Sequence, residues 1–234
     1  MALFLLSDDP RFPSADLAEG NGLLAVGGDL TPRRLLAAYR GGIFPWFSEG
    51  DPLLWWSPDP RLVLKPEWLH IPRSLAKTIR RKTFAITFDH AFGEVITACA
   101  KIRRSGESGT WITREMIDAY LALHRLGHAH SVEAWTGTGA SRTLAGGLYG
   151  IVQGGCFFGE SMFHRVPDAS KVAFVTLVHH LAAQGFTLID CQMTTDHLLR
   201  FGAREIARAL FLKMLRETRH DSMPPGPWHS FSRP

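Results

Sequence analysis

Three strand-like runs follow one another between residues 131 and 163, and they constrain the fold of this chain more than any other feature. The runs are Ser131–Trp135, Leu144–Val152 and Cys156–Phe163, and the residues 136–140 between the first two, Thr-Gly-Thr-Gly-Ala, are typical of a hairpin connection. Predicted helices precede and follow these strands along the chain. This order indicates an α+β or α/β fold in which helices layer a mixed sheet.

The other elements of this region are predicted from periodicity and capping residues. Thr113 is a good N-cap, and Glu115 is favourable in the first turn of the helix that follows it. Together the patterns predict helices over 73–82, 92–102, 113–126, 170–183, 197–201 and 206–217, and further strands over 84–88 and 187–193.

The first 62 residues differ from the rest because they are rich in Pro, Gly and Trp. They contain one clear helix, which Thr31 caps, Pro32 begins and a pair of glycines at 41 and 42 ends. The remainder of this segment has residues typical of turns. We therefore expect a small N-terminal domain over residues 1–62 that covers a larger domain over residues 63–234.

Composition excludes several classes of protein. Hydrophobic residues make up 45% of the chain and charged residues 21%, which is typical of a globular protein and not of a disordered one. No uncharged run matches a membrane span, and Met1–Leu6 is too short for the apolar part of a signal peptide. The three cysteines lie far apart, so we expect neither a disulfide framework nor a thiolate zinc site. We expect a soluble cytoplasmic protein with no membrane partner.

One stretch between Pro72 and Thr83 contains no acidic residue and carries five positive charges. These are Arg73, Lys77, Arg80, Arg81 and Lys82. Such a cluster is expected where a protein contacts a polyphosphate partner, because each contacted phosphate releases counterions. A helix face exposed to water explains the same charges equally well.

Two predicted strands each carry one acid among apolar residues. Alternation places Asp190 and Gln192 on one face of the strand over 187–193, and it places Glu160 on the same face as Phe158 and Met162. A carboxylate in an apolar strand is costly to bury unless it is paired or hydrogen-bonded. A functional role is slightly favoured, and a structural role, such as pairing with an arginine, stays open.

The common cofactor and metal signatures are absent from the sequence. There is no GxxxxGK(S/T), GxGxxG or HExxH motif. His124, His128 and His130 are close in sequence, but no carboxylate or cysteine accompanies them at a spacing suited to a metal. We therefore expect no cofactor and no metal ion.

Seven short motifs occur in a fixed order along the chain, and together they resemble the bacterial leucyl/phenylalanyl-tRNA–protein transferases. The resemblance extends from Phe12 to the last helix. Each motif alone is weak, but seven in order are specific. The motifs are FPWF at 44–47, LWWSPDPR at 54–61, GTWIT at 109–113, AHSVE at 129–133, GGLYG at 146–150, GESMF at 159–163 and IDCQ at 189–192.

This resemblance implies an activity, a fold and partners. Members of the family move Leu, Phe or, less well, Met from aminoacyl-tRNA to the N-terminal Arg or Lys of a protein, which marks that protein for degradation. The larger domain is expected to be GNAT-like, with the small N-terminal domain packed against it. The implied partners are aminoacyl-tRNA and proteins with N-terminal Arg or Lys, and we expect the chain to act as a monomer.

The resemblance also implies roles for individual residues. Trp46 and Trp111 would flank the terminal adenosine of the donor. An apolar pocket for the aminoacyl side chain would include Leu148, Met162 and Leu177. The catalytic candidates Asp190 and Gln192 would lie at the reacting ester, with Glu160 nearby. The five cations Arg73, Lys77, Arg80, Arg81 and Lys82 would lie along the acceptor stem of the tRNA.

The implied reaction is aminolysis of an activated ester, which needs neither a metal nor a covalent intermediate. The attacking α-amine has a pKa of about 7.7–8.0, so a modest base suffices at neutral pH. Our hypothesis is that the carbonyl oxygen of Gln192 accepts a hydrogen bond from this amine, while Asp190 orients and polarises Gln192. Glu160 would pair with the cationic side chain or the α-ammonium group of the acceptor.

Two alternatives belong to other functional classes. An acyl-CoA-dependent N-acetyltransferase on the same fold would carry a Q/R-x-x-G-x-G/A turn, but the nearest stretch, Arg103–Ser108, ends in Ser. A non-catalytic RNA-binding module would explain the basic stretch and the aromatic residues. It would not explain two acids on neighbouring strands.

Overall fold

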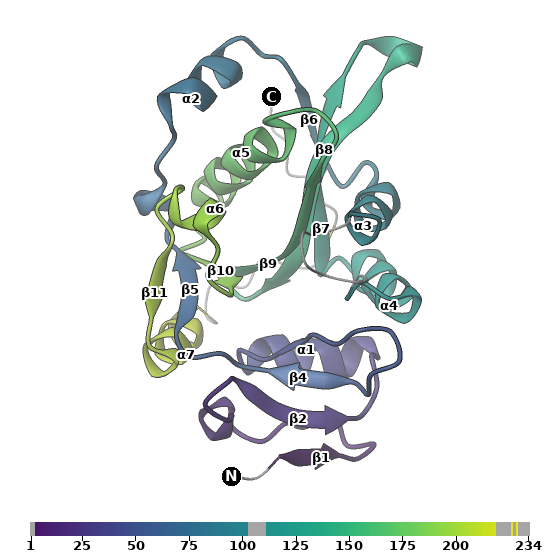
Figure 1. Ribbon diagram of the computed structural model, residues 1–234, viewed down its shortest axis with the longest axis vertical. Helices are drawn as coiled ribbons and strands as arrows, with labels where there is room; N and C mark the ends of the chain where they lie inside the picture. Colours follow the sequence, from purple (N-terminus) through teal and green to yellow (C-terminus); the bar gives the residue numbers. More distant parts are fainter. Residues whose placement is uncertain (1–2, 103–110, 219–225, 227, 229–234) are drawn as a thin grey trace.

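The chain folds into a small sheet and a large sheet, and the small sheet lies below the large one in Figure 1. The computed structural model describes residues 3–102, 111–218, 226 and 228. The small sheet has four strands in the order β1-β2-β4-β3, and the large sheet has seven in the order β11-β5-β10-β9-β8-β7-β6. The architecture is therefore mixed α+β, as the sequence predicts.

The long strands of the large sheet lie at its centre. β7 and β8 form the predicted antiparallel hairpin, β8 and β9 are also antiparallel, and β10 runs parallel to β9. Strand bounds are β5 (Arg61–Leu64), β6 (Ala85–Phe88), β7 (Ala129–Thr136), β8 (Thr143–Gln153), β9 (Cys156–His164), β10 (Leu188–Gln192) and β11 (Arg204–Ile206).

Helices cover both faces of the large sheet. α5 packs on one face and α3 and α4 pack on the other, so two separate apolar clusters form (Figure 1). Each predicted helix of this region is present within a few residues of its expected bounds. The bounds are α2 (Arg73–Arg80), α3 (Phe92–Ala100), α4 (Arg114–Arg125), α5 (Ala169–Ala183), α6 (Asp196–Leu199) and α7 (Arg208–Glu217).

The N-terminal part contains more regular structure than the sequence predicts. Its helix α1 (Pro32–Arg40) begins after Thr31, whose hydroxyl accepts the backbone N–H of Arg34, so this prediction is confirmed. The expectation of turns elsewhere is wrong, because short strands pair there. These strands are β1 (Phe4–Leu6), β2 (Leu23–Gly27), β3 (Phe44–Pro45) and β4 (Leu54–Trp56). All but β2 are too short to show the alternation expected of a strand, and β2 is apolar without alternation.

The two sheets meet through α1 and through the strand that follows the small sheet. α1 contacts both β3 and β8, and it lies between the two sheets in Figure 1. β5 belongs to the large sheet, where it pairs with β10 and β11. The division of the chain after residue 62 remains a prediction. Within the described part of the chain, no helix has both the length and the apolar character needed to span a membrane.

Gly150 allows β8 and β9 to approach each other closely. A Cβ atom at this position would lie 2.2 Å from the carbonyl oxygen of Phe158 and 2.4 Å from Cζ of Phe157. Real Cβ atoms are not found so close to backbone oxygen, and a packed interior cannot shift freely to make room. The glycine is therefore required by the packing of these two strands.

We predict that Gly150→Ala lowers the free energy of unfolding by about 2 kcal/mol or more, as overpacking of a core does. Urea unfolding followed by circular dichroism measures the loss. Gly93→Ala is the matched control, because a Cβ at Gly93 in α3 would meet only Leu121, at 3.8 Å. Equal stability of the two variants would contradict this account of the β8–β9 contact.

Candidate active site

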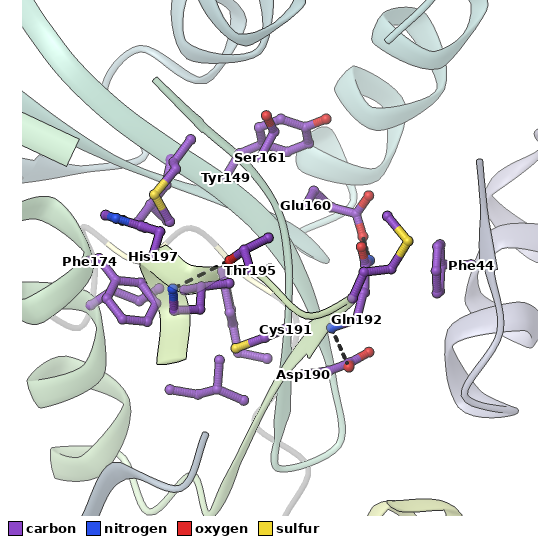
Figure 2. A pocket seen from close by; sticks show the side chains of 18 of the residues that line it. Phe44, Tyr149, Glu160, Ser161, Phe174, Asp190, Cys191, Gln192, Thr195 and His197 are labelled. Atoms are coloured by element: carbon purple, nitrogen blue, oxygen red, sulfur yellow. Dashed lines mark hydrogen bonds between the residues drawn. The ribbon is translucent and has the colours of Figure 1, made fainter. Parts of the chain in front are cut away.

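A cavity of about 440 Å³ opens where β8, β9 and β10 meet α5, α6 and the end of β3. Figure 2 shows it with many of its lining side chains. The structure places eight of the candidate residues from the sequence in this single cavity. They are Trp46, Trp111, Leu148, Glu160, Met162, Leu177, Asp190 and Gln192.

One part of the cavity wall is apolar and lies on the α5 face of the large sheet. Leu148 from β8, Met162 from β9 and Leu177 from α5 belong to the apolar cluster on this face. Phe157 and Phe174 extend the same wall. This part of the cavity can hold a side chain such as that of leucine or phenylalanine, because every group named here is hydrophobic.

Two indole rings form another part of the wall. Trp46 follows β3 and is half-buried, while Trp111 precedes α4 and is buried. The position of Trp46 is fixed by the indole N–H of Trp56, which donates to its carbonyl oxygen at 2.7 Å, and by the edge-on packing of the two rings. Flat aromatic faces of this kind are suited to stacking on a nucleobase.

Glu160 occupies a bulge in β9. Tyr149 of β8 pairs with Ser161, whereas the next residue, Gly150, pairs with Gly159, so Glu160 is the extra residue. The bulge exchanges the faces of the strand: Phe158 packs in the cluster that α3 and α4 cover, and Met162 packs in the α5 cluster. The expectation that Glu160 shares a face with both is therefore wrong.

Three donors surround the carboxylate of Glu160. Oε1 accepts the hydroxyl of Tyr39 at 2.8 Å and the side-chain Nε2–H of Gln192 at 2.9 Å, and Oε2 accepts the hydroxyl of Tyr120 at 3.0 Å. Burial disfavours the charged form and raises the pKa of Glu160 to about 7, although these hydrogen bonds partly oppose the shift.

The hydrogen bonds among Tyr39, Tyr120 and Glu160 also favour the protonated form of Glu160, in agreement with its raised pKa. The hydroxyls of Tyr39 and Tyr120 also contact each other, so three oxygen–oxygen contacts form a ring with the carboxyl group. Two phenols supply two protons, which leaves one contact without a proton when Glu160 is ionised. Protonation of Glu160 supplies the third proton and completes the ring.

Asp190 is paired with an arginine, as one interpretation of its apolar strand allowed. Arg61 of β5 donates to it twice, from Nε to Oδ1 at 2.8 Å and from Nη2 to Oδ2 at 2.6 Å, and both side chains are fully buried. The guanidinium lies against the rings of Phe44 and Phe211. Such a bidentate pair fixes both position and orientation.

Gln192 is held at its backbone by one acid and at its side chain by the other. Its backbone N–H donates to Oδ1 of Asp190 at 2.9 Å, where the chain takes a left-handed conformation with φ of 60°. Its amide nitrogen donates to Glu160, so the amide carbonyl oxygen is the group left for a ligand. Glu160, and not Asp190, therefore orients the side chain of Gln192.

The basic residues lie outside the cavity. Arg73, Lys77 and Arg80 are on α2, Arg81 and Lys82 follow it, and all five side chains are exposed. Leu75 is the buried residue of α2, and the helix packs against α5. A partner that contacts these cations would lie against the outside of the α2–α5 layer.

Sequence reasoning missed three residues of the site. Arg61 carries the same signal as Asp190, a single charge in an otherwise apolar strand, so the pair could have been suggested from charge alone. Tyr39 and Tyr120 carry no such signal, because each lies on the apolar face of its helix. Their hydroxyl groups become part of the site only through the packing of α1 against α4.

Two of the three clustered histidines contact other groups through their ring nitrogens. Nδ1 of His124 lies 2.8 Å from the carbonyl oxygen of Ala129, and Nδ1 of His130 lies 2.8 Å from the carboxylate of Asp89. No group of three or more His, Cys, Asp or Glu side chains suited to a metal occurs among the described residues. The candidate turn at 103–108 lies outside them.

Comparison with known proteins identifies the family. The sequence model of the leucyl/phenylalanyl-tRNA protein transferase family matches residues 63–216, and the sequence model of that family's N-terminal domain matches residues 28–59. This chain belongs to the leucyl/phenylalanyl-tRNA–protein transferase family.

Family members are similar to this chain over nearly its whole length. A leucyl/phenylalanyl-tRNA–protein transferase from Magnetococcus marinus is 57% identical over 229 residues, which cover 97% of each chain. One from Anaeromyxobacter sp. (strain Fw109-5) is 61% identical over 215 residues, covering 92% of this chain and 90% of the relative. Among solved structures, L-PGS from Bacillus licheniformis aligns with a TM-score of 0.42 at 12% identity, covering 74% of this chain and 55% of the other.

The buried pair of this transferase gives a stability prediction. Asp190→Leu leaves the Arg61 charge buried without a partner, and Arg61→Met does the same to the Asp190 charge. Each single change should lower the free energy of unfolding by about 3–5 kcal/mol. The double variant Arg61→Met/Asp190→Leu removes both charges and should be clearly more stable than the sum of the two single changes predicts. Urea unfolding of the wild type, the two single variants and the double variant forms a double-mutant cycle. If the two single losses in free energy of unfolding simply add up in the double variant, the pairing is contradicted.

The raised pKa of Glu160 predicts a pH-dependent stability. Between pH 4.5 and about 7 the folded protein holds a proton that the unfolded chain has released, so the free energy of unfolding falls as the pH rises through this range. Glu160→Gln cannot lose a proton. The wild type should therefore lose stability relative to this variant between pH 5 and pH 8 in urea unfolding.

The exposed Glu94→Gln variant serves as the control for removal of one carboxyl group. A difference between wild type and Glu160→Gln that stays constant with pH would show that Glu160 is not titrating in this range.

Proposed function

We propose that this chain is an aminoacyltransferase that moves leucine from leucyl-tRNA to the N-terminal Arg or Lys of an acceptor protein and so creates a signal for degradation. Phenylalanine and methionine are further donors. Family membership supports the reaction. The cavity supports the roles proposed for single residues, because two indole rings, an apolar wall and the hydrogen-bonded amide of Gln192 line the same space.

The donor end of the tRNA would occupy the indole and apolar walls together. Stacking on an aromatic ring contributes about 1–3 kcal/mol per base, so Trp46 and Trp111 would anchor a terminal adenosine. The esterified side chain would then enter between Leu148, Met162 and Leu177. Donors with a branched Cβ, such as Ile and Val, are disfavoured because their side chains are stiff next to the backbone.

The five exposed cations at α2 would contact the tRNA backbone. Contacts to phosphates add affinity without reading the amino acid that the tRNA carries. Choice among donors must therefore come from the apolar wall, where one methylene group is worth about 1–3 kcal/mol. Because binding of the tRNA backbone and choice of the amino acid depend on different residues, a single cavity can accept more than one aminoacyl-tRNA.

The chemical step is attack of the acceptor α-amine on the ester carbonyl carbon. A C–N bond forms, the C–O bond to the tRNA ribose breaks, and the amine loses a proton that the released ribose oxygen gains, directly or through water, to become a hydroxyl group. The carbonyl oxygen of Gln192 positions the amine through a hydrogen bond. Glu160 orients this amide and Asp190 fixes its backbone. Because three donors already surround Glu160, an orienting role fits it better than direct pairing with the acceptor cation.

We also propose that the enzyme acts as a monomer in the cytoplasm, where charged tRNA and newly exposed protein N-termini are both present. No cofactor is needed, because the ester of the donor already activates the acyl group.

The direct test mixes purified protein, charged leucyl-tRNA and a peptide beginning with Arg, and then measures the mass of the peptide. A gain of one leucine, absent with an N-acetylated peptide, supports the proposal. Binding of deacylated tRNA without any product would favour a non-catalytic RNA-binding module. Transfer from acetyl-CoA in place of leucyl-tRNA would favour an N-acetyltransferase.

Replacement of Gln192 should separate turnover from binding. Gln192→Ala removes the oxygen that positions the amine and should lower kcat by about 100-fold, the scale of a misplaced reacting group. Affinity for leucyl-tRNA, measured by filter binding, should change little. Gln153→Ala at the end of β8, outside the cavity, is the control. Equal loss of turnover and tRNA affinity would assign Gln192 a structural role.

A further inference from the structure

Trp228, far from the catalytic network in sequence, is buried against the apolar wall of the cavity. We propose that Trp228 is a positioning residue that holds Phe157 in this wall and so sets the size of donor side chain that the cavity accepts. The proposal rests on the proposed function. It adds a residue close to the end of the chain to the determinants of donor choice.

The indole of Trp228 is enclosed by aromatic rings from four elements, and the residue is 1% exposed. It stacks on His130 of β7 with ring centroids 4.3 Å apart and an interplanar angle of 4°. His180 of α5 lies at 5.0 Å, and Phe88 of β6 meets it edge-on at 5.8 Å. Such enclosure gives the indole one position.

The backbone of Trp228 is fixed by the same carboxylate that fixes its stacking partner. Oδ2 of Asp89 accepts the backbone N–H of Trp228 at 2.8 Å and lies 2.8 Å from Nδ1 of His130. Oδ1 of Asp89 accepts the backbone N–H of Ser131 at 2.8 Å. Asp89 is itself buried, so the position of Trp228 is determined by polar contacts as well as by packing.

Phe157 connects this enclosed indole to the cavity. Its ring lies 5.9 Å from the ring of Trp228, centroid to centroid, and it also lines the cavity with Leu148 and Leu177. Next to the ring lies Gly150, where even a Cβ atom would come within 2.4 Å of Phe157. Phe157 therefore has no free space toward β8, and Trp228 occupies the space on another side.

Removal of the indole would open space behind Phe157. The phenyl ring could then move away from the cavity, because cavities left by large-to-small changes are partly filled by neighbouring groups. The apolar wall would become deeper, and a larger donor side chain would gain more than a smaller one. Trp228 is not among the residues that line the cavity with Gln192, Trp46 and Trp111, so acceptor use should be unaffected.

The test compares phenylalanyl-tRNA with leucyl-tRNA as donors to one Arg peptide. In Trp228→Ala the ratio of kcat/KM for the phenylalanyl donor to that for the leucyl donor should rise about threefold or more, since one misfitting methylene already changes such ratios by about tenfold. KM for the peptide should stay unchanged. Both donors are measured on the same preparation, so loss of folded protein cancels in the ratio.

Two further variants make the result specific. Trp228→Phe keeps an aromatic ring against Phe157 and should restore most of the wild-type ratio. Trp135→Ala removes a tryptophan that packs against the other apolar cluster, on the α3 and α4 face, and does not line the cavity, so it should leave the ratio unchanged. If Trp228→Ala does not fold by circular dichroism, Trp228→Leu replaces it under the same criterion.

An unchanged ratio in an active Trp228→Ala enzyme, with both rates lowered equally, would reduce Trp228 to a structural residue and overturn the proposal. A wild type that transfers neither amino acid would instead overturn the proposed function, and this proposal with it.

Discussion

The buried pair between Arg61 and Asp190 is the interaction on which the site depends. Arg61 lies where the chain leaves the small sheet and enters the large one, and Asp190 lies on the neighbouring strand β10. The pair therefore ties the start of β5 to the strand that ends in Gln192. An uncompensated charge at either position would be costly. The left-handed backbone at Gln192 is stabilised because Asp190 also accepts its N–H.

A second polar network makes the two parts of the chain interdependent. Tyr39 comes from the N-terminal helix α1, whereas Tyr120, Glu160 and Gln192 come from elements of the large sheet and its helices. The small sheet also supplies Phe44 and Trp46 to the cavity wall. The N-terminal segment is thus part of the site and not only a cover for it, since the amide of Gln192 is oriented through groups from both parts.

The sequence predicts the long helices and strands, and which residues line the cavity, better than it predicts the contacts among those residues. Residues 129–164 form strands because apolar runs and a glycine-rich turn suffice to specify a hairpin, and Thr31 and Thr113 cap helices as expected. The bulge at Glu160 could not be predicted, because simple alternation assumes an unbroken register. The partner of Asp190 lies 129 residues away in the chain, so the lone charge of Arg61 in an apolar strand could suggest the pair but could not establish it. The strands of two to five residues in the N-terminal part are set by tertiary pairing and not by local pattern.

A crystal structure with a stable leucyl-adenosine, in which an amide replaces the ester, would show directly whether the cavity holds the donor. We predict that the adenine lies between Trp46 and Trp111 and that the amide nitrogen of Gln192 keeps its hydrogen bond to Glu160. The leucyl side chain should lie against the apolar wall formed by Leu148, Met162 and Leu177. An adenosine bound outside this cavity, or a leucyl side chain pointing to solvent, would contradict it.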